Sequence, residues 1–176
     1  MKQLINLLLF FIMLLASSHI CAQQSKNDNL SINISYQKYP QKYLSKQLHV
    51  FSIDSYYNIN KHVETGAFIG VGKSFYESSI KQNDLLYGIS AKVKTLPFFI
   101  DTDNLRLSIY LTEKIGGNYS TVDLYSYKEK NNKFIWSSYV GVEYFFSKHI
   151  GALFELGFEH IHENRFNSRY GFSYKF

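Results

Sequence analysis

The sequence is poor in the residues that disulfide-stapled and metal-binding proteins depend on. Its 176 residues include one Cys, two Pro and one Trp, and no apolar run beyond residue 16 is long enough for a transmembrane helix. Because the single Cys21 lies near the N-terminus, a disulfide framework and a Cys-based metal site are excluded. Lys and Arg exceed Asp and Glu by five without forming a cluster, which argues against nucleic-acid binding.

The N-terminal segment is typical of an export signal. Lys2 provides a positive start, an apolar run spans residues 4–16, and small residues follow. We expect residues 1–22 to be a signal peptide cleaved after Ala22, which leaves 23–176 as one domain without cysteine. Two alternatives stay open: an uncleaved anchor helix, and a lipoprotein acylated at Cys21, although the residue before that cysteine is not small.

Aromatic residues make up 18% of the chain, and they alternate with polar residues along most of its length. Period-2 alternation is the pattern of a β-strand with two different faces. It predicts strands over residues 30–39, 47–59, 62–75, 85–96, 104–115, 134–146, 149–160 and 167–176. Most of these are about ten residues or longer, the length that a tilted strand needs to cross a bilayer, whereas strands of soluble sandwiches are about half as long.

Glycines and charges recur together on one face of these strands. In the fourth strand, Leu85, Tyr87 and Ile89 share one face, while Gly88 and Lys92 share the other. A soluble barrel would have no reason to place glycines with its outward charges, but a membrane barrel has a narrow polar interior in which they fit. We therefore predict an all-β fold, an eight-stranded antiparallel transmembrane β-barrel with up-and-down meander topology.

The segment GVEYFFSKHIGALFELGF (residues 141–158) and the ending YGFSYKF (170–176) resemble the outer-membrane β-barrel (porin family) proteins of Gram-negative bacteria, which are small OmpA/OmpX-like barrels. The resemblance implies an integral protein of the cell outer membrane, in contact with outer-membrane lipid and with both termini periplasmic. It also implies an insertion signal that the barrel-insertion machinery reads on the lipid face of the last strand: Tyr170, Phe172, Tyr174 and Phe176.

The polar face carries five charges of each sign, which predicts a paired network in the lumen. The acidic members are Asp54, Glu64, Glu143, Glu155 and Glu159, and the basic ones are Lys92, Lys94, Arg106, Arg169 and Lys175. We expect Arg106, Lys92, Glu143 and Glu155, near mid-strand, to form the central cluster. Such a network would plug the lumen, and a narrow gated pore through the same pairs is the alternative.

The expected function is that of a non-enzymatic, monomeric structural or surface-interaction protein. Residues 116–133 are expected to form the longest loop, and Tyr119, Tyr125 and Tyr127 lie in it among Ser, Asn and Lys. This composition suits contact with an extracellular ligand, and equally an ordinary hydrophilic loop.

Two further functions are alternatives to this expectation. A lipid-A-modifying outer-membrane hydrolase would need a Ser–His pair with an acidic residue, and His160, His162, Glu163 and Ser168 lie near the last hairpin. The His-x-Ser spacing of the deacylase family is absent, so we interpret them as a solvated loop without a metal or cofactor. A soluble, lipocalin-type barrel would need an apolar interior, which the charge placement contradicts.

Overall fold

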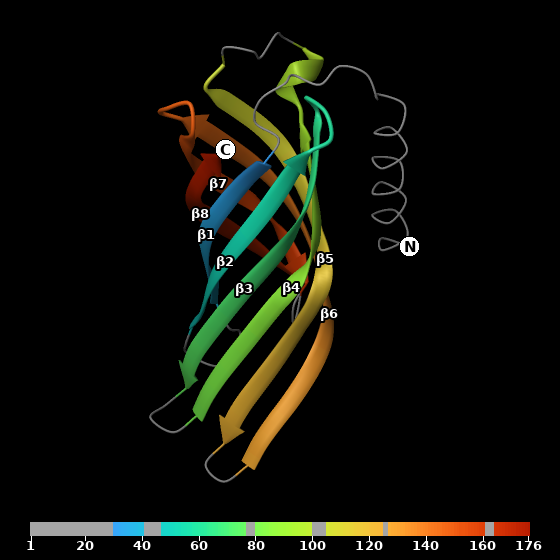
Figure 1. Cartoon of the computed structure of the whole chain (residues 1–176). Helices are drawn as coiled ribbons and strands as arrows, with labels where there is room; N and C mark the ends of the chain where they lie inside the picture. Colours follow the sequence, from blue (N-terminus) through green and yellow to red (C-terminus); the bar gives the residue numbers. More distant parts are fainter. Residues whose placement is uncertain (1–29, 41–46, 77–79, 100–104, 125–126, 161–163) are drawn as a thin grey trace.

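The chain forms a closed barrel in which each strand pairs with the strands before and after it (Figure 1). The computed structural model describes residues 30–40, 47–76, 80–99, 105–124, 127–160 and 164–176. All pairings are antiparallel, and β8 returns to β1, which confirms the predicted eight-stranded meander. The strands are β1 (Leu30–Pro40), β2 (Gln47–Asn58), β3 (Val63–Tyr76), β4 (Ile80–Lys94), β5 (Leu107–Leu124), β6 (Tyr127–Phe145), β7 (Ile150–His160) and β8 (Asn164–Lys175).

Side chains alternate between an apolar outer wall and a polar interior. Along β7, Phe154, Leu156 and Phe158 are exposed on the outside, whereas Glu155 and Glu159 are buried inside. The same inversion holds around the barrel, because most of the large exposed side chains are apolar and most of the buried ones are polar. This is the arrangement of a barrel whose outer solvent is hydrocarbon.

The barrel closes between β1 and β8. The two strands pair from Ser31 opposite Lys175 to Gln37 opposite Arg169, so β8 has a partner on both sides. On the outer wall, the ring centroids of Tyr36 and Tyr170 lie 5.2 Å apart across this seam. Closure removes the exposed aromatic edge that the last strand would otherwise present.

Several inward glycines let neighbouring backbones come close together. A Cβ atom on Gly116 would lie 1.9 Å from the carbonyl oxygen of Tyr87, and one on Gly88 would lie 2.2 Å from that of Ile115. These two glycines face each other in the β4–β5 register. The two backbones can approach closely here because neither strand carries an inward side chain at this pair.

The prediction of a long loop at residues 116–133 is wrong. β5 and β6 stay paired from Leu107 opposite Tyr144 to Leu124 opposite Tyr127, so most of this segment is a hairpin. All residues from 128 to 134 are exposed, on both faces of β6. Because both faces are exposed, the alternation that marks a strand disappears from the sequence. β4 begins at Ile80 instead of the expected residue 85, because its first residues are polar on both faces, with Lys81 and Asn83 exposed and Gln82 and Asp84 buried.

The end of the barrel opposite the tip of the β5–β6 hairpin consists of tight turns and a short 3-10 helix, η1 (Leu96–Phe98). There the His62 ring stacks on Phe98, with centroids 4.2 Å apart. Burial, together with the charge of Lys61, lowers the pKa of His62 below its ordinary value, so the stacked ring is neutral near pH 7. No helix within the described residues is long and apolar enough to cross a membrane.

Adding a methyl group at Gly116 should weaken the barrel, because its Cβ would collide with the Tyr87 carbonyl oxygen. We expect Gly116→Ala to cost about 1–3 kcal/mol of unfolding free energy. Gly117→Ala is the matched control, because its Cβ would meet only the movable end of the Tyr87 side chain. Urea unfolding in micelles, followed by the migration of unheated samples on gels, measures both. Equal midpoints for the two variants would contradict the close approach.

Candidate functional site: the charged lumen

Arg169 of β8 joins three other strands at the centre of the lumen. Its Nη2 lies 2.6 Å from Oδ2 of Asp54 on β2, and its Nη1 lies 3.0 Å from Oε2 of Glu155 on β7. The same Nη2 also donates to the Ser35 hydroxyl of β1 at 2.5 Å. Lys114 of β5 completes the cluster, with Nζ 2.6 Å from Oδ1 of Asp54. Two cations thus hold one buried carboxylate between them.

A second ion cluster surrounds Glu64 of β3. Its carboxylate pairs with Lys94 at 2.5 Å and with Lys92 at 3.3 Å, and both lysines come from β4. The Lys92 ammonium also lies 4.2 Å and 4.5 Å from the ring centroids of Tyr56 and Tyr110. These two tyrosines are buried, so the cation is neutralised by a carboxylate and shielded by aromatic faces.

The structure brings three of the four predicted central residues into the lumen. Lys92, Glu143 and Glu155 are all at most 2% exposed, and the charge of Lys92 interacts with both carboxylates. Glu143 also accepts a hydrogen bond from the Ser173 hydroxyl. Arg106 does not join them: it is exposed and precedes β5, which begins at Leu107 instead of the expected residue 104. Arg169, named in the wider network, occupies the centre in its place.

Sequence reasoning missed Lys114 and three lumen tyrosines, Tyr56, Tyr110 and Tyr139, all buried. Lys114 follows Thr112 at the spacing of two that marks the inward face, so the sequence did contain a signal for it. The tyrosines share this inward parity, and the sequence pattern puts Tyr110 on the polar face of its strand with Ser108 and Thr112, but a tyrosine ring suits a lipid-facing wall equally well. Tyr110 lies over Gly141, whose added Cβ would be 2.3 Å from its ring atoms.

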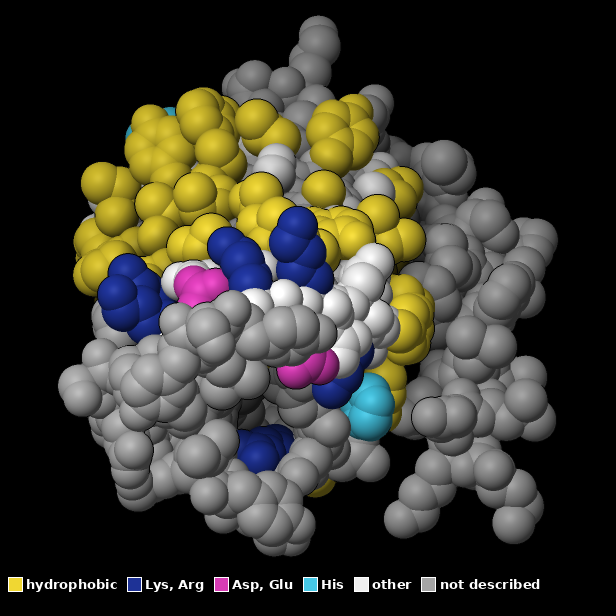
Figure 2. All heavy atoms as spheres, turned by 90° about the horizontal axis from the view of Figure 1, so that it is seen from below, with side chains coloured by type: hydrophobic (Ala, Val, Ile, Leu, Met, Phe, Trp, Pro, Cys, Tyr) yellow, Lys and Arg dark blue, Asp and Glu magenta, His cyan; other side chains and the backbone are white. Residues whose placement is uncertain are grey.

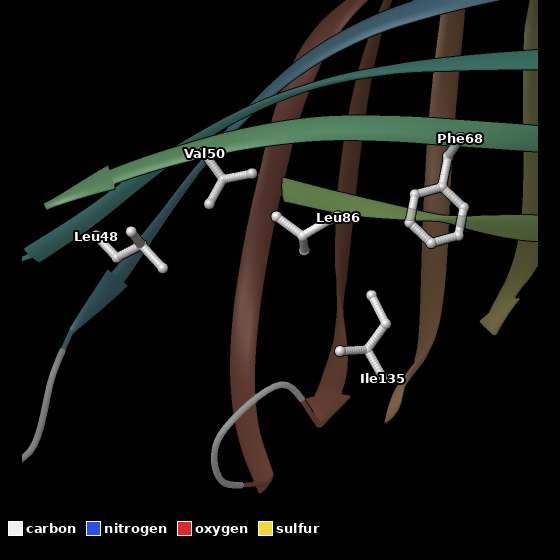
Figure 3. Close-up of a cluster of buried hydrophobic side chains, with 5 residues drawn as sticks. All are labelled: Leu48, Val50, Phe68, Leu86 and Ile135. Carbon is white, nitrogen blue, oxygen red and sulfur yellow. The ribbon is translucent and has the colours of Figure 1, made fainter. Parts of the chain in front are cut away.

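Beyond the ion clusters, the lumen narrows around a polar triad and an apolar cluster. Gln37 donates to Glu159 Oε2 at 2.6 Å, and the Tyr139 hydroxyl donates to the same oxygen at 2.7 Å. Figure 3 shows the apolar cluster, in which side chains from four strands converge: Leu48, Val50, Phe68, Leu86 and Ile135. A cavity of about 20 Å³ between these groups and Arg169 has room for about one water molecule.

The residues weighed for hydrolase or metal chemistry lie on the outer wall or outside the described residues. Ser168 pairs across to Leu156, whereas His160 pairs with Asn164, which precedes Ser168 by four positions on β8. Residues 162 and 163 fall outside the described part of the chain. Within the described ranges, no three His, Cys, Asp or Glu side chains gather as a metal site would require.

The four residues of the expected insertion signal share the outer face of the C-terminal segment. Tyr170, Phe172, Tyr174 and Phe176 are 43–64% exposed and alternate with inward residues such as Arg169 and Ser173. The Tyr174 and Phe176 rings contact each other edge to face, with centroids 4.9 Å apart. Recognition of this face by insertion machinery stays a prediction.

Removing the Arg169 guanidinium should destabilise the barrel strongly, because Asp54 and Glu155 would each lose an ion-pair partner in a buried site. We expect Arg169→Ala to lower the free energy of unfolding by about 3–5 kcal/mol. Arg106→Ala is the matched control, and because Arg106 is exposed its effect should stay within about 0.5 kcal/mol. Denaturant unfolding in micelles measures both, and similar losses would contradict the assigned positions.

Comparison with known proteins agrees with this architecture. The barrel is similar to the Neisserial surface protein NspA (TM-score 0.63, 15% identity, 84% of this chain and 96% of that chain covered). It is also similar to OprG of Pseudomonas aeruginosa (TM-score 0.58, 12% identity, 85% and 97% covered) and to Ail of Yersinia pestis (TM-score 0.54, 14% identity, 84% and 96% covered).

No curated protein matches the sequence. The family model described as "Outer membrane protein beta-barrel domain" matches residues 7–176. The chain therefore belongs to this family of integral outer-membrane β-barrels of Gram-negative bacteria.

Proposed function

We propose that this barrel is a non-enzymatic surface-interaction protein that binds polyanionic ligands outside the cell. The observation that carries the proposal is the four-stranded sheet β3–β6, which continues past the rest of the barrel wall (Figure 1). Pairing of β2 with β3 ends at His49 opposite Lys73, and pairing of β6 with β7 begins only at Trp136 opposite His160. A hydrogen-bonded sheet presents a preordered surface, which lowers the entropy cost of binding.

The extended sheet carries more positive than negative charge. Five of its lysines are exposed, Lys73, Lys81, Lys128, Lys130 and Lys133, and the acidic side chains beside them are Asp123 and Glu129. Figure 2 looks onto this end of the molecule and shows basic side chains next to a broad hydrophobic surface. Lys128 and Asp123 are 3.7 Å apart and both are largely exposed, so this pair is weak.

A relative of the same fold supports a ligand of this chemistry. The structure of Ail of Yersinia pestis has been determined in complex with the heparin analogue sucrose octasulfate. Sulfated and phosphorylated sugars are the polyanions that a row of exposed lysines would bind. In this proposal the extended sheet faces the outside, and the opposite end, with both termini, faces the periplasm.

We further propose that the side chains in the lumen plug it. The two ion clusters, the buried tyrosines and the apolar cluster of Figure 3 occupy the interior, and the cavity of about 20 Å³ between them holds about one water molecule. Filling the lumen with paired charges would stabilise a closed barrel and would leave binding to the exposed sheet.

The polyanion proposal predicts that the detergent-solubilised protein is retained on a heparin column. We expect the triple variant Lys128→Gln/Lys130→Gln/Lys133→Gln to elute at clearly lower salt, because each charge-assisted contact contributes to a salt-dependent affinity. Lys61→Gln/Lys148→Gln, at the tight turns of the other end, is the charge control and should elute close to the parent. Unchanged elution of the triple variant would show that these lysines of the extended sheet do not bind heparin.

The plug proposal predicts no steady conductance of the parent protein in planar bilayers. Arg169→Ala should raise the frequency of brief openings, because it removes an ion-pair partner from Glu155 and leaves Asp54 paired with Lys114 alone. Arg106→Ala, at the exposed end of the wall, should leave the baseline unchanged. Stable single-channel openings of the parent protein would show that the lumen is a pore and would contradict the plug proposal.

A further inference from the structure

The outer wall carries one acidic side chain in the middle of its apolar belt. Glu113 of β5 alternates with the buried residues Thr112 and Lys114, so it points outward. Apolar outward residues precede and follow it along the strand: Leu107, Ile109, Leu111, Ile115 and Tyr119. A lipid-facing carboxyl group near the middle of a membrane is costly and therefore marks a functional position.

The chain satisfies this carboxyl group only in part. Ser138 lies opposite Glu113 on β6, and its hydroxyl donates to Glu113 Oε1 at 2.5 Å. Among the described residues, this is the hydrogen bond that the structure gives to the Glu113 side chain. Hydrocarbon offers no further donor, so the second oxygen needs a partner from outside the barrel.

The outward side chains in register with Glu113 on the neighbouring strands are small. Thr65, Ala91, Glu113 and Ser138 lie opposite one another on β3, β4, β5 and β6, and we call these four residues the acidic row. The same cross-strand row ends on each side at a large exposed aromatic side chain, Tyr57 on β2 next to Thr65 and Phe158 on β7 next to Ser138. Small residues with hydroxyl groups are what membrane-embedded interfaces use, because they let two backbones approach closely.

We propose that the acidic row is the interface through which two copies of this chain associate side by side in the membrane. Both copies are inserted in the same direction, so a twofold axis along the membrane normal that passes beside Glu113 brings Glu113 of one copy against Glu113 of the other at equal depth. The row is self-complementary, because it holds a carboxyl group and two hydroxyl groups. A neutral carboxylic acid both donates and accepts, so each Glu113 can bind Glu113 or Ser138 of the second copy.

This interface is separate from the extended sheet that carries the proposed ligand site. It replaces the monomer expected from the sequence and does not involve the exposed lysines of β3–β6. Failure of the heparin test would therefore leave this inference intact, and the reverse also holds.

Cysteine cross-linking in native membranes tests the interface on the full chain. Ala91→Cys places a thiol in the acidic row, and Ile34→Cys places one on the outer wall of β1 as the matched control. With a short bifunctional maleimide, we expect a dimer-sized band at least ten times stronger for Ala91→Cys than for Ile34→Cys. The parent chain, whose one cysteine is Cys21, should give no such band.

The Glu113 side chain should control this cross-link. In the Ala91→Cys background, Glu113→Leu is expected to lower the dimer band severalfold, whereas Glu113→Gln, which still donates and accepts, retains it. Only variants with the gel migration of a folded, unheated barrel are scored. If Glu113→Leu does not fold, Thr65→Leu, which enlarges the row without touching the carboxyl group, should give the same loss. Equal bands from both faces, a cross-link to a different protein, or a dimer band unaffected by these changes would overturn the interface.

Discussion

The structure depends on one constraint: hydrocarbon offers no hydrogen bonds to a backbone, so every strand needs a partner on both sides. The β1–β8 pairing meets this constraint by closing the sheet. Closure gives the wall two faces with opposite solvents, and the outward face must be apolar. Polar and charged side chains are then directed into the narrow interior, where buried charges form ion pairs. The ion clusters around Arg169 and Glu64 follow from the lipid outside.

The interior combines large side chains such as Arg169 and Tyr139 with many small ones such as Ser35, because the lumen of an eight-stranded barrel is narrow. Glycines remove side chains where neighbouring strands crowd, and buried tyrosines fill the space beside them, as Tyr110 does over Gly141. The tyrosine faces also stabilise cations, since Lys92 lies against both Tyr56 and Tyr110. Packing and electrostatics are therefore supplied by the same residues.

The alternation of the strands made the architecture predictable, because a wall between lipid and a polar lumen sorts its residues with period two. The same rule placed Lys92, Glu143 and Glu155 inside. It fails where its physical cause is absent: residues 128–134 are exposed on both faces, so the sequence shows no strand pattern there and predicts a loop in place of the β5–β6 hairpin. Arg106 occupies a position of inward parity, but it precedes Leu107, the first residue of β5. Parity alone could not show which cation reaches Asp54, because that choice depends on the register between strands far apart in the sequence.

Arg169 links the closure of the barrel to ion pairing in its lumen. Its guanidinium contacts Ser35 on β1, Asp54 on β2 and Glu155 on β7, so its contacts lie on both sides of the seam. The Glu155 contact joins two strands that are neighbours in the sequence, whereas the Ser35 and Asp54 contacts depend on the pairing of β8 with β1. Closure of the seam and completion of the Arg169 ion cluster therefore require the same pairing.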